Sequence, residues 1–215
     1  MEKIFFRYRD CWKKKGFITS LLLSFLLAFL SLIFNYLSNI YTGSSLVKPV
    51  GDILLDNLPA FNVNFILNEG VSTFIFLLLF FVFIEPKRIP FFFKSMALFV
   101  FIRSIFVSLT HLGPPTGHIA LDPNDWFSWL AVGNDYFFSG HTGMPFLAAL
   151  IFWREKLIRY ISLFFCWLFA TSMLLGHLHY SIDVFAAFFI TYTIFEIAKK
   201  LFTKDYRMFH EEKKL

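Results

Sequence analysis

Long apolar runs constrain this chain more than any other feature. The run from Phe17 to Tyr36 holds no charged residue, and as a helix it is long enough to cross roughly 30 Å of hydrocarbon. Four further runs of similar length lie at 65–84, 89–109, 157–176 and 180–201. Hydrophobic residues make up 57% of the chain and charged residues only 16%, which is unusual for a soluble domain. The sequence therefore predicts an all-α, multi-pass integral membrane protein.

A sixth apolar run is shorter. The twelve residues from Thr142 to Trp153 cover only roughly 18 Å as a helix. A helix that crosses the membrane here must begin at or before Ser139, which places His141 near its N-terminus and below the headgroup surface. With this run included, we predict six transmembrane helices.

The six runs define one membrane domain, residues 17–201, between a basic segment at 1–16 and a charged tail at 202–215. The basic segment interleaves cations with aromatic residues, which suits either an amphipathic helix in the headgroup layer or a plain basic flank. Residues 37–64 contain glycines, prolines and several Asn and Asp, and are expected to form a loop outside the membrane.

The positive charges indicate the orientation. If both termini are cytoplasmic, all 20 Lys and Arg residues except Lys48 and Arg103 fall in cytoplasmic segments. The formal charge of +5 is explained by this asymmetry, and no stripe of basic and aromatic residues indicates a nucleic-acid partner. The same orientation puts Asp135, His141 and His179 on the non-cytoplasmic side, which is the periplasm, the Golgi lumen or the cell exterior.

Two polar stretches at the ends of apolar runs carry the candidate chemistry. His179 and Asp183 are spaced i, i+4, so on a helix they share a face, and the carboxylate can hold the imidazole in one tautomer. An oriented imidazole is a competent nucleophile or base, and His141 on another helix can protonate a leaving oxygen. Two helix N-termini favour a phosphate between them, and Gly140 allows close approach of the backbone. Phosphoryl or phosphodiester transfer without a metal or other cofactor is the resulting hypothesis.

Other interpretations remain open for several of these residues. A metal site made from His141, His177, His179 and Asp183 is an alternative, although His177 and His179 point apart on a helix. His111, His118, His177 and His210 are more simply polar anchors at the interface, and Trp126 and Trp129 an interfacial aromatic belt.

The two stretches resemble a known family. Ser139-Gly140-His141 and His179-x-x-x-Asp183 are similar to the catalytic motifs of the type 2 phosphatidic acid phosphatase (PAP2) superfamily. The longer patterns, Gly-x-Asp135-x-x-x-Ser139-Gly140-His141-Thr142 and His177-x-His179-Tyr180-Ser181-x-Asp183-Val184, resemble its sphingomyelin synthase-related branch. The likeness covers roughly residues 100–200, and the segment 52–59 is more weakly similar to the first outer loop of that branch.

The resemblance implies a six-helix PAP2-like bundle that works through a phosphohistidine. His179, paired with Asp183, would attack the lipid phosphorus, and His141 would protonate the departing diacylglycerol oxygen. Ser139, Gly140, Thr142 and Tyr180 belong to the same motifs and are expected at the substrate. Water or a second lipid hydroxyl would then release the phospho-headgroup.

This chain departs from the phosphatase branch in its cations. Met173 stands six residues before His179, where that branch has an arginine. Fewer cations suit a phosphodiester with a zwitterionic headgroup. Arg103 is then either the phosphate partner or a structural ion-pair partner, and Asp135 either binds an amine headgroup or caps a helix.

The function predicted from the sequence is transfer of phosphocholine or phosphoethanolamine from a phospholipid donor to a ceramide or diacylglycerol acceptor at the outer leaflet. A lipid phosphatase or phospholipase C-like hydrolase is the alternative within enzymes, and a non-enzymatic lipid-binding or transport protein is the alternative outside them. The sequence does not indicate the oligomeric state.

Overall fold

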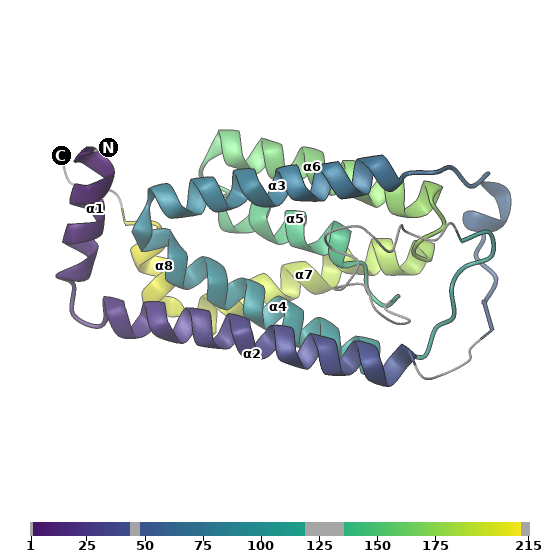
Figure 1. Ribbon diagram of the computed structural model, residues 1–215, viewed down its shortest axis with the longest axis horizontal. Coiled ribbons are helices and arrows are strands. Elements are labelled where there is room, and N and C mark those ends of the chain that lie inside the picture. The colour runs from purple at the N-terminus through teal and green to yellow at the C-terminus, as the bar shows by residue number, and fades with distance from the viewer. Residues whose placement is uncertain (1, 44–47, 119–135, 212–215) are drawn as a thin grey trace.

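The computed structural model of this protein describes residues 2–43, 48–118 and 136–211 (Figure 1). Within these ranges the regular structure is helical. The longer helices are α1 (Glu2–Trp12), α2 (Phe17–Gly43), α3 (Asn64–Ile84), α4 (Ile89–Leu109), α5 (Gly140–Ile151), α6 (Lys156–Leu175), α7 (Ser181–Leu201) and α8 (Thr203–Phe209). Two short 3₁₀ turns, Leu55–Asn57 and Pro86–Arg88, lie in the connections before α3 and α4.

Five of the described helices are long and apolar enough to cross a membrane: α2, α3, α4, α6 and α7. Helix α5 is different, because its 12 residues cover roughly 18 Å. It begins one residue after Ser139, so the longer sixth crossing that we expected is not found among the described residues. The described part of the chain is thus all-helical, with five candidate spans and one short helix, α5, inside the bundle.

Helix α5 lies inside the bundle and packs against α6 and α7 (Figure 1). Its second half is fully buried, since Leu147, Ala148, Ala149 and Ile151 have no exposed surface. Most of this short helix is covered by protein, although Met144 is 39% exposed, so its length need not match the membrane. The histidine at its start is therefore held by protein on several sides.

Helix α2 continues beyond the expected end of its run at Tyr36 and reaches Gly43. The sequence predicted a loop here because residues 37–43 are more polar. In the structure Ser38, Asn39 and Thr42 are buried against α4, and the Ser38 hydroxyl lies 2.9 Å from the carbonyl oxygen of Ser104. Interhelical hydrogen bonds of this kind stabilise membrane helix pairs, so the polar residues extend the helix.

Different helices lie at the two ends of the bundle (Figure 1). Helices α1 and α8 lie at one end, which we call the α8 end. There the buried Lys94 ammonium contacts the Asp205 carboxylate at 2.6 Å and the Ser20 hydroxyl at 2.7 Å, which ties α4, α8 and α2 together. The start of α5 and the start of α7 lie at the opposite end, which we call the His179 end.

Candidate active site

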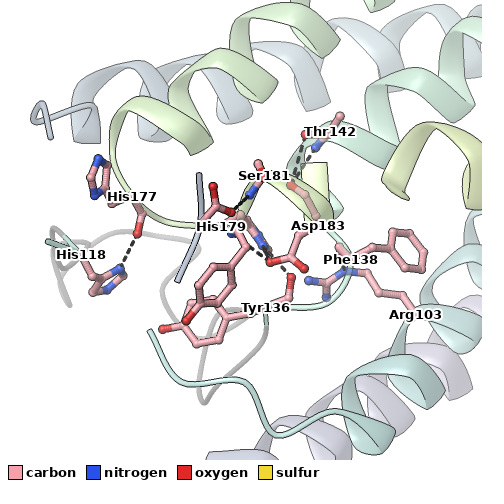
Figure 2. Close-up of polar contacts among 12 residues, drawn as sticks. Arg103, His118, Tyr136, Phe138, Thr142, His177, His179, Ser181 and Asp183 are labelled. Atoms are coloured by element: carbon pink, nitrogen blue, oxygen red, sulfur yellow. Dashed lines mark hydrogen bonds and ion pairs between the residues drawn. The ribbon is translucent and has the colours of Figure 1, made fainter. Parts of the chain in front are cut away.

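His179 lies at the His179 end of the bundle, two residues before α7 begins (Figure 2). Its Nδ1 is 2.7 Å from the carbonyl oxygen of Tyr136 and 3.5 Å from Oδ2 of Asp183. The carbonyl oxygen only accepts hydrogen bonds, so Nδ1 carries the proton and the lone pair of the neutral ring is on Nε2. The tautomer is set mainly by a backbone carbonyl and supported by the carboxylate.

Asp183 is brought to His179 by a turn. We expected the two residues to share a helix face, but His179 precedes the first helical residue. Oδ2 of Asp183 accepts the backbone N–H of Tyr180 at 3.0 Å, which caps α7 and folds the preceding residues back toward the carboxylate. The other oxygen, Oδ1, is buried and has no hydrogen-bond partner in the part of the chain that the structure describes.

The start of α5 is joined directly to the start of α7. The backbone N–H of Ser139 donates to the carbonyl oxygen of Asp183 at 3.1 Å. The Ser139 hydroxyl caps α5 by accepting from the Thr142 N–H at 3.4 Å and from the Thr142 hydroxyl at 3.2 Å. Both side chains are fully buried, so they hold the helix start in place beside the carboxylate.

Arg103 reaches the same place from α4 (Figure 2). Its Nε donates to the carbonyl oxygen of Phe138 at 2.7 Å, and the side chain is buried. A Cβ on Gly140 would lie 3.1 Å from this Nε, so a glycine lets the backbone approach the guanidinium closely. His141 is the next residue, in the first turn of α5, and its side chain is partly buried.

The N-terminus of α7 is already occupied. We expected both helix N-termini to face a phosphate, but the first N–H of α7, that of Ser181, donates to Oδ2 of Asp52 at 2.6 Å. Oδ1 of Asp52 accepts from the N–H groups of Leu54 and Leu55. Burial opposes ionisation of Asp52, but these hydrogen bonds outweigh burial and lower its pKa below the usual value. Asp52 therefore acts as a charged cap supplied by a distant loop.

Tyr180 is also engaged by protein groups. Its hydroxyl donates to the carbonyl oxygen of Gly113 at 2.9 Å and accepts the Val50 N–H at 3.2 Å. The ring packs near Tyr136 and is almost completely buried. Tyr180, which we expected at the substrate, thus joins the segment at Val50 to the segment at Gly113.

His177 is directed away from His179 (Figure 2). Its Nδ1 lies 2.7 Å from the Thr116 carbonyl oxygen and its Nε2 lies 3.1 Å from the Leu58 carbonyl oxygen, while its own carbonyl oxygen is 3.3 Å from Nδ1 of His118. No group of three or more His, Cys, Asp or Glu residues is arranged to hold a metal ion in the described ranges. His177 connects the three segments that surround the site.

Asp135, an expected site residue, lies outside the described ranges, as do Trp126 and Trp129 of the expected interfacial belt. The sequence did not predict the contacts that three other residues make at the site: Tyr136, Asp52 and His177. Tyr136 acts through its carbonyl oxygen, which every residue type carries, so no sequence signal marks it. Asp52 was noted only as part of a weak likeness, and the contacts of His177 depend on two loops that are distant in sequence.

The C-terminal part of the chain matches a described family. Residues 133–201 match the family model of the PAP2 superfamily C-terminal domain. This match supports membership of the PAP2 superfamily. Members of the PAP2 superfamily are generally phosphatases or phosphotransferases, so the match suggests activity of this type on lipids. No curated protein sequence matches the chain.

We call the segment that matches this family model, residues 133–201, the PAP2 segment. It contains His141, His179 and Asp183, together with the buried hydrogen bond between the starts of α5 and α7. Arg103 and Asp52 lie before it. The site is thus assembled from the PAP2 segment and two additional elements, α4 and the loop before α3.

Proposed function

We propose that this protein transfers a phospho-headgroup, phosphocholine or phosphoethanolamine, from a glycerophospholipid to a ceramide or diacylglycerol acceptor. The observation that carries the proposal is the arrangement around His179, whose Nδ1 faces the Tyr136 carbonyl oxygen at 2.7 Å within a PAP2 segment. Such an arrangement presents Nε2 as the nucleophilic atom. The buried Asp183 carboxylate at 3.5 Å stabilises the positive charge that develops on the ring.

The first chemical step forms a phosphohistidine. Nε2 of His179 attacks the phosphorus of the donor lipid, so an N–P bond forms while the P–O bond to diacylglycerol breaks. Protonated His141 gives its proton to the departing oxygen, which leaves as the diacylglycerol hydroxyl. The guanidinium of Arg103 adds positive charge beside the phosphoryl oxygens.

The second step reverses these roles. Neutral His141 accepts the proton of the acceptor hydroxyl as its oxygen attacks the phosphorus. The N–P bond breaks, and its electron pair returns to Nε2 of His179. The products are a new phospholipid and the enzyme in its starting protonation state.

The sphingomyelin synthase-related branch is favoured over the phosphatase branch by the surroundings of Met173. The phosphatase branch carries an arginine at this position. Met173 is 1% exposed and belongs to the hydrophobic core, where a cation would be unpaired. A site with fewer cations suits a phosphodiester better than a dianionic monoester, and an acceptor alcohol then takes the place of water.

The decisive experiment is product analysis with the purified full chain in mixed micelles. Phosphatidylcholine, phosphatidylethanolamine and phosphatidic acid, each labelled in the phosphate, are compared with and without ceramide or diacylglycerol. We expect a new labelled phospholipid that depends on the acceptor, and an acid-labile, base-stable label on the protein. Free phospho-headgroup or inorganic phosphate as the main product, whatever the acceptor, contradicts the transferase and favours the hydrolase.

Variants assign the residues in the same assay. We expect His179→Ala to abolish both protein labelling and turnover, and His141→Ala to slow turnover by about 10²–10⁴-fold. His111→Ala is the matched control, because His111 lies after α4 at the same end of the bundle and contacts the ring of Tyr41. Full activity in both His179→Ala and His141→Ala excludes catalysis by these residues and favours a lipid-binding or transport protein.

We further propose that the site faces the non-cytoplasmic side, as the distribution of Lys and Arg favours. Cysteine labelling tests this in sealed vesicles of known orientation. Ser181→Cys, at the His179 end, is expected to react from the non-cytoplasmic side, and Lys156→Cys, at the start of α6, from the cytoplasmic side. The opposite pattern reverses the orientation.

A further inference from the structure

The α8 end of the bundle contains a cavity that the proposed reaction does not use. It has a volume of about 330 Å³, which is within the range of small-ligand sites. Its wall is formed by the end of α5, the second half of α7 and α8, through Leu150, Trp153, Arg154, Tyr192, Phe195, Lys199, Tyr206 and His210. Measured along the axis of α7 at 1.5 Å for each residue, Lys199 lies roughly 30 Å from His179. The cavity is therefore separate from the candidate active site.

The charged groups of the cavity are mainly cationic. Arg154 and Lys199 line it, and Lys199 also pairs with Glu196 at 2.7 Å. The Lys199 ammonium lies over the rings of Phe195 and Tyr206, at 5.2 and 5.8 Å from their centroids, which holds it against the wall. One carboxylate thus offsets part of the positive charge, and a net positive site remains.

The pKa of His210 depends on burial and on the cations near the cavity. Burial lowers its pKa to about 4, and the nearby Arg154 and Lys87 act in the same direction. The ring is therefore neutral near pH 7, and it packs edge-on against Tyr206 at 4.7 Å. A neutral imidazole can donate one hydrogen bond to an anion without adding a second unpaired charge.

The aromatic residues of the wall match a membrane interface. Trp153 and Tyr192 are half exposed; Trp153 lies two residues after the end of α5, and Tyr192 lies near the middle of α7. Trp and Tyr are enriched where lipid headgroups meet hydrocarbon, and basic pockets between membrane helices bind anionic headgroups. A ligand here would have an anionic head beside Arg154 and an apolar part beside Leu150.

We propose that this cavity binds a phosphate-bearing anion, with Arg154 and Lys199 as its charge partners. The phosphate group belongs either to an anionic lipid of the surrounding leaflet or to a free phosphate compound. In both cases the ligand is not the substrate, because it occupies the end of the bundle opposite to His179.

The test uses the purified full chain in nanodiscs of phosphatidylcholine with or without one tenth phosphatidylglycerol, and separately in detergent with inorganic phosphate. Retained lipid is measured by native mass spectrometry. We expect retention of phosphatidylglycerol over phosphatidylcholine, reduced about tenfold in the Arg154→Gln/Lys199→Gln double variant. Lys200→Gln is the matched control, because Lys200 is adjacent on α7 and does not line the cavity. His179→Ala is expected to retain the lipid as the wild type does.

A second readout follows His210 directly. A bound anion near Arg154 offsets the charge that lowers the His210 pKa, so NMR titration should show that pKa rising when the ligand is added. The same rise with inorganic phosphate alone, lost in the double variant, identifies a free phosphate as the ligand source. Equal lipid retention in the wild type, the double variant and Lys200→Gln, with no change at His210, overturns the proposal.

Discussion

The Asp52 carboxylate accepts the backbone N–H of Ser181 at 2.6 Å, although 129 residues separate the two positions in sequence. Ser181 opens α7, and His179 lies two residues before it. A carboxylate at a helix N-terminus satisfies an unpaired N–H group and interacts favourably with the helix dipole. The loop before α3 thereby fixes the start of the helix that presents the candidate nucleophile.

Asp52→Asn should reduce both stability and activity. The amide keeps the shape of the side chain but loses the charge, and hydrogen bonds to charged groups contribute about 1.5–3 kcal/mol each. We expect the free energy of unfolding to fall by about 1–3 kcal/mol and kcat to fall more than KM changes, because His179 is less well placed. Thermal unfolding in detergent and steady-state kinetics measure the two effects. Asp56→Asn is the comparison, since Asp56 accepts one backbone N–H, that of Asp52, and should cost less.

The contribution of Asp52 should depend on pH in a defined direction. Its pKa is lower in the folded protein than the usual 3.8, so the stabilisation is fully present above that value. It is lost as pH falls through the folded-state pKa. The stability difference between wild type and Asp52→Asn should therefore be constant between pH 7 and pH 5 and shrink below about pH 4. A difference that grows toward low pH contradicts the assignment of Asp52 as an ionised cap.

His177 should matter through its two ring contacts and its backbone. The residue has a φ of 52°, in the left-handed region that asparagine and glycine tolerate and β-branched residues do not. His177→Asn keeps this backbone conformation but loses the contacts to the Thr116 and Leu58 carbonyl oxygens. We expect faster hydrogen exchange in residues 58–63 and 113–118 with a moderate loss of kcat. His177→Val adds backbone strain and should be less stable than His177→Asn; the reverse order contradicts this account.

The lengths of the apolar runs predict most of the helix bounds, but they do not predict how the site residues contact one another. The bounds expected for the runs at 65–84, 89–109 and 157–176 agree with α3, α4 and α6 within one residue, because an apolar length is read directly from side chains. The extension of α2 to Gly43 depends instead on burial of polar residues against α4. The prediction that His179 and Asp183 lie together is correct. They do not share a helix face, however, because a capping turn joins them.

The main contacts that orient the site involve backbone groups. The Tyr136 carbonyl oxygen faces His179, the Phe138 carbonyl oxygen faces Arg103, and the Ser181 N–H faces Asp52. Every residue carries a carbonyl group, and all but proline carry an N–H, so sequence composition does not mark these partners. They become visible only when segments distant in sequence are placed together.

Gly143 should be required for α5 to pack. A Cβ at this position would lie 2.6 Å from Cζ of Phe99 on α4 and 2.9 Å from Oγ1 of Thr191 on α7. Glycine to alanine normally stabilises a helix interior by about 1 kcal/mol, so a loss would show that packing dominates. We expect Gly143→Ala to lower stability by about 1–3 kcal/mol and to reduce kcat, because α5 carries His141. Unchanged stability and activity would show that α5 tolerates a shift away from its neighbours.

The Lys94–Asp205 pair should be the main polar determinant of packing at the α8 end. Both side chains are at most 10% exposed, and the Ser20 hydroxyl donates to Oδ1 of Asp205 at 2.6 Å. Lys94→Met leaves a buried carboxylate without its cation, which costs about 3–5 kcal/mol. Lys94→Met/Asp205→Leu removes both charges and should recover most of this loss. A double-mutant cycle followed by thermal unfolding measures the coupling. Because the pair lies far from His179, the double variant should retain catalytic activity, and loss of activity with recovered stability would show that the two ends of the bundle are coupled.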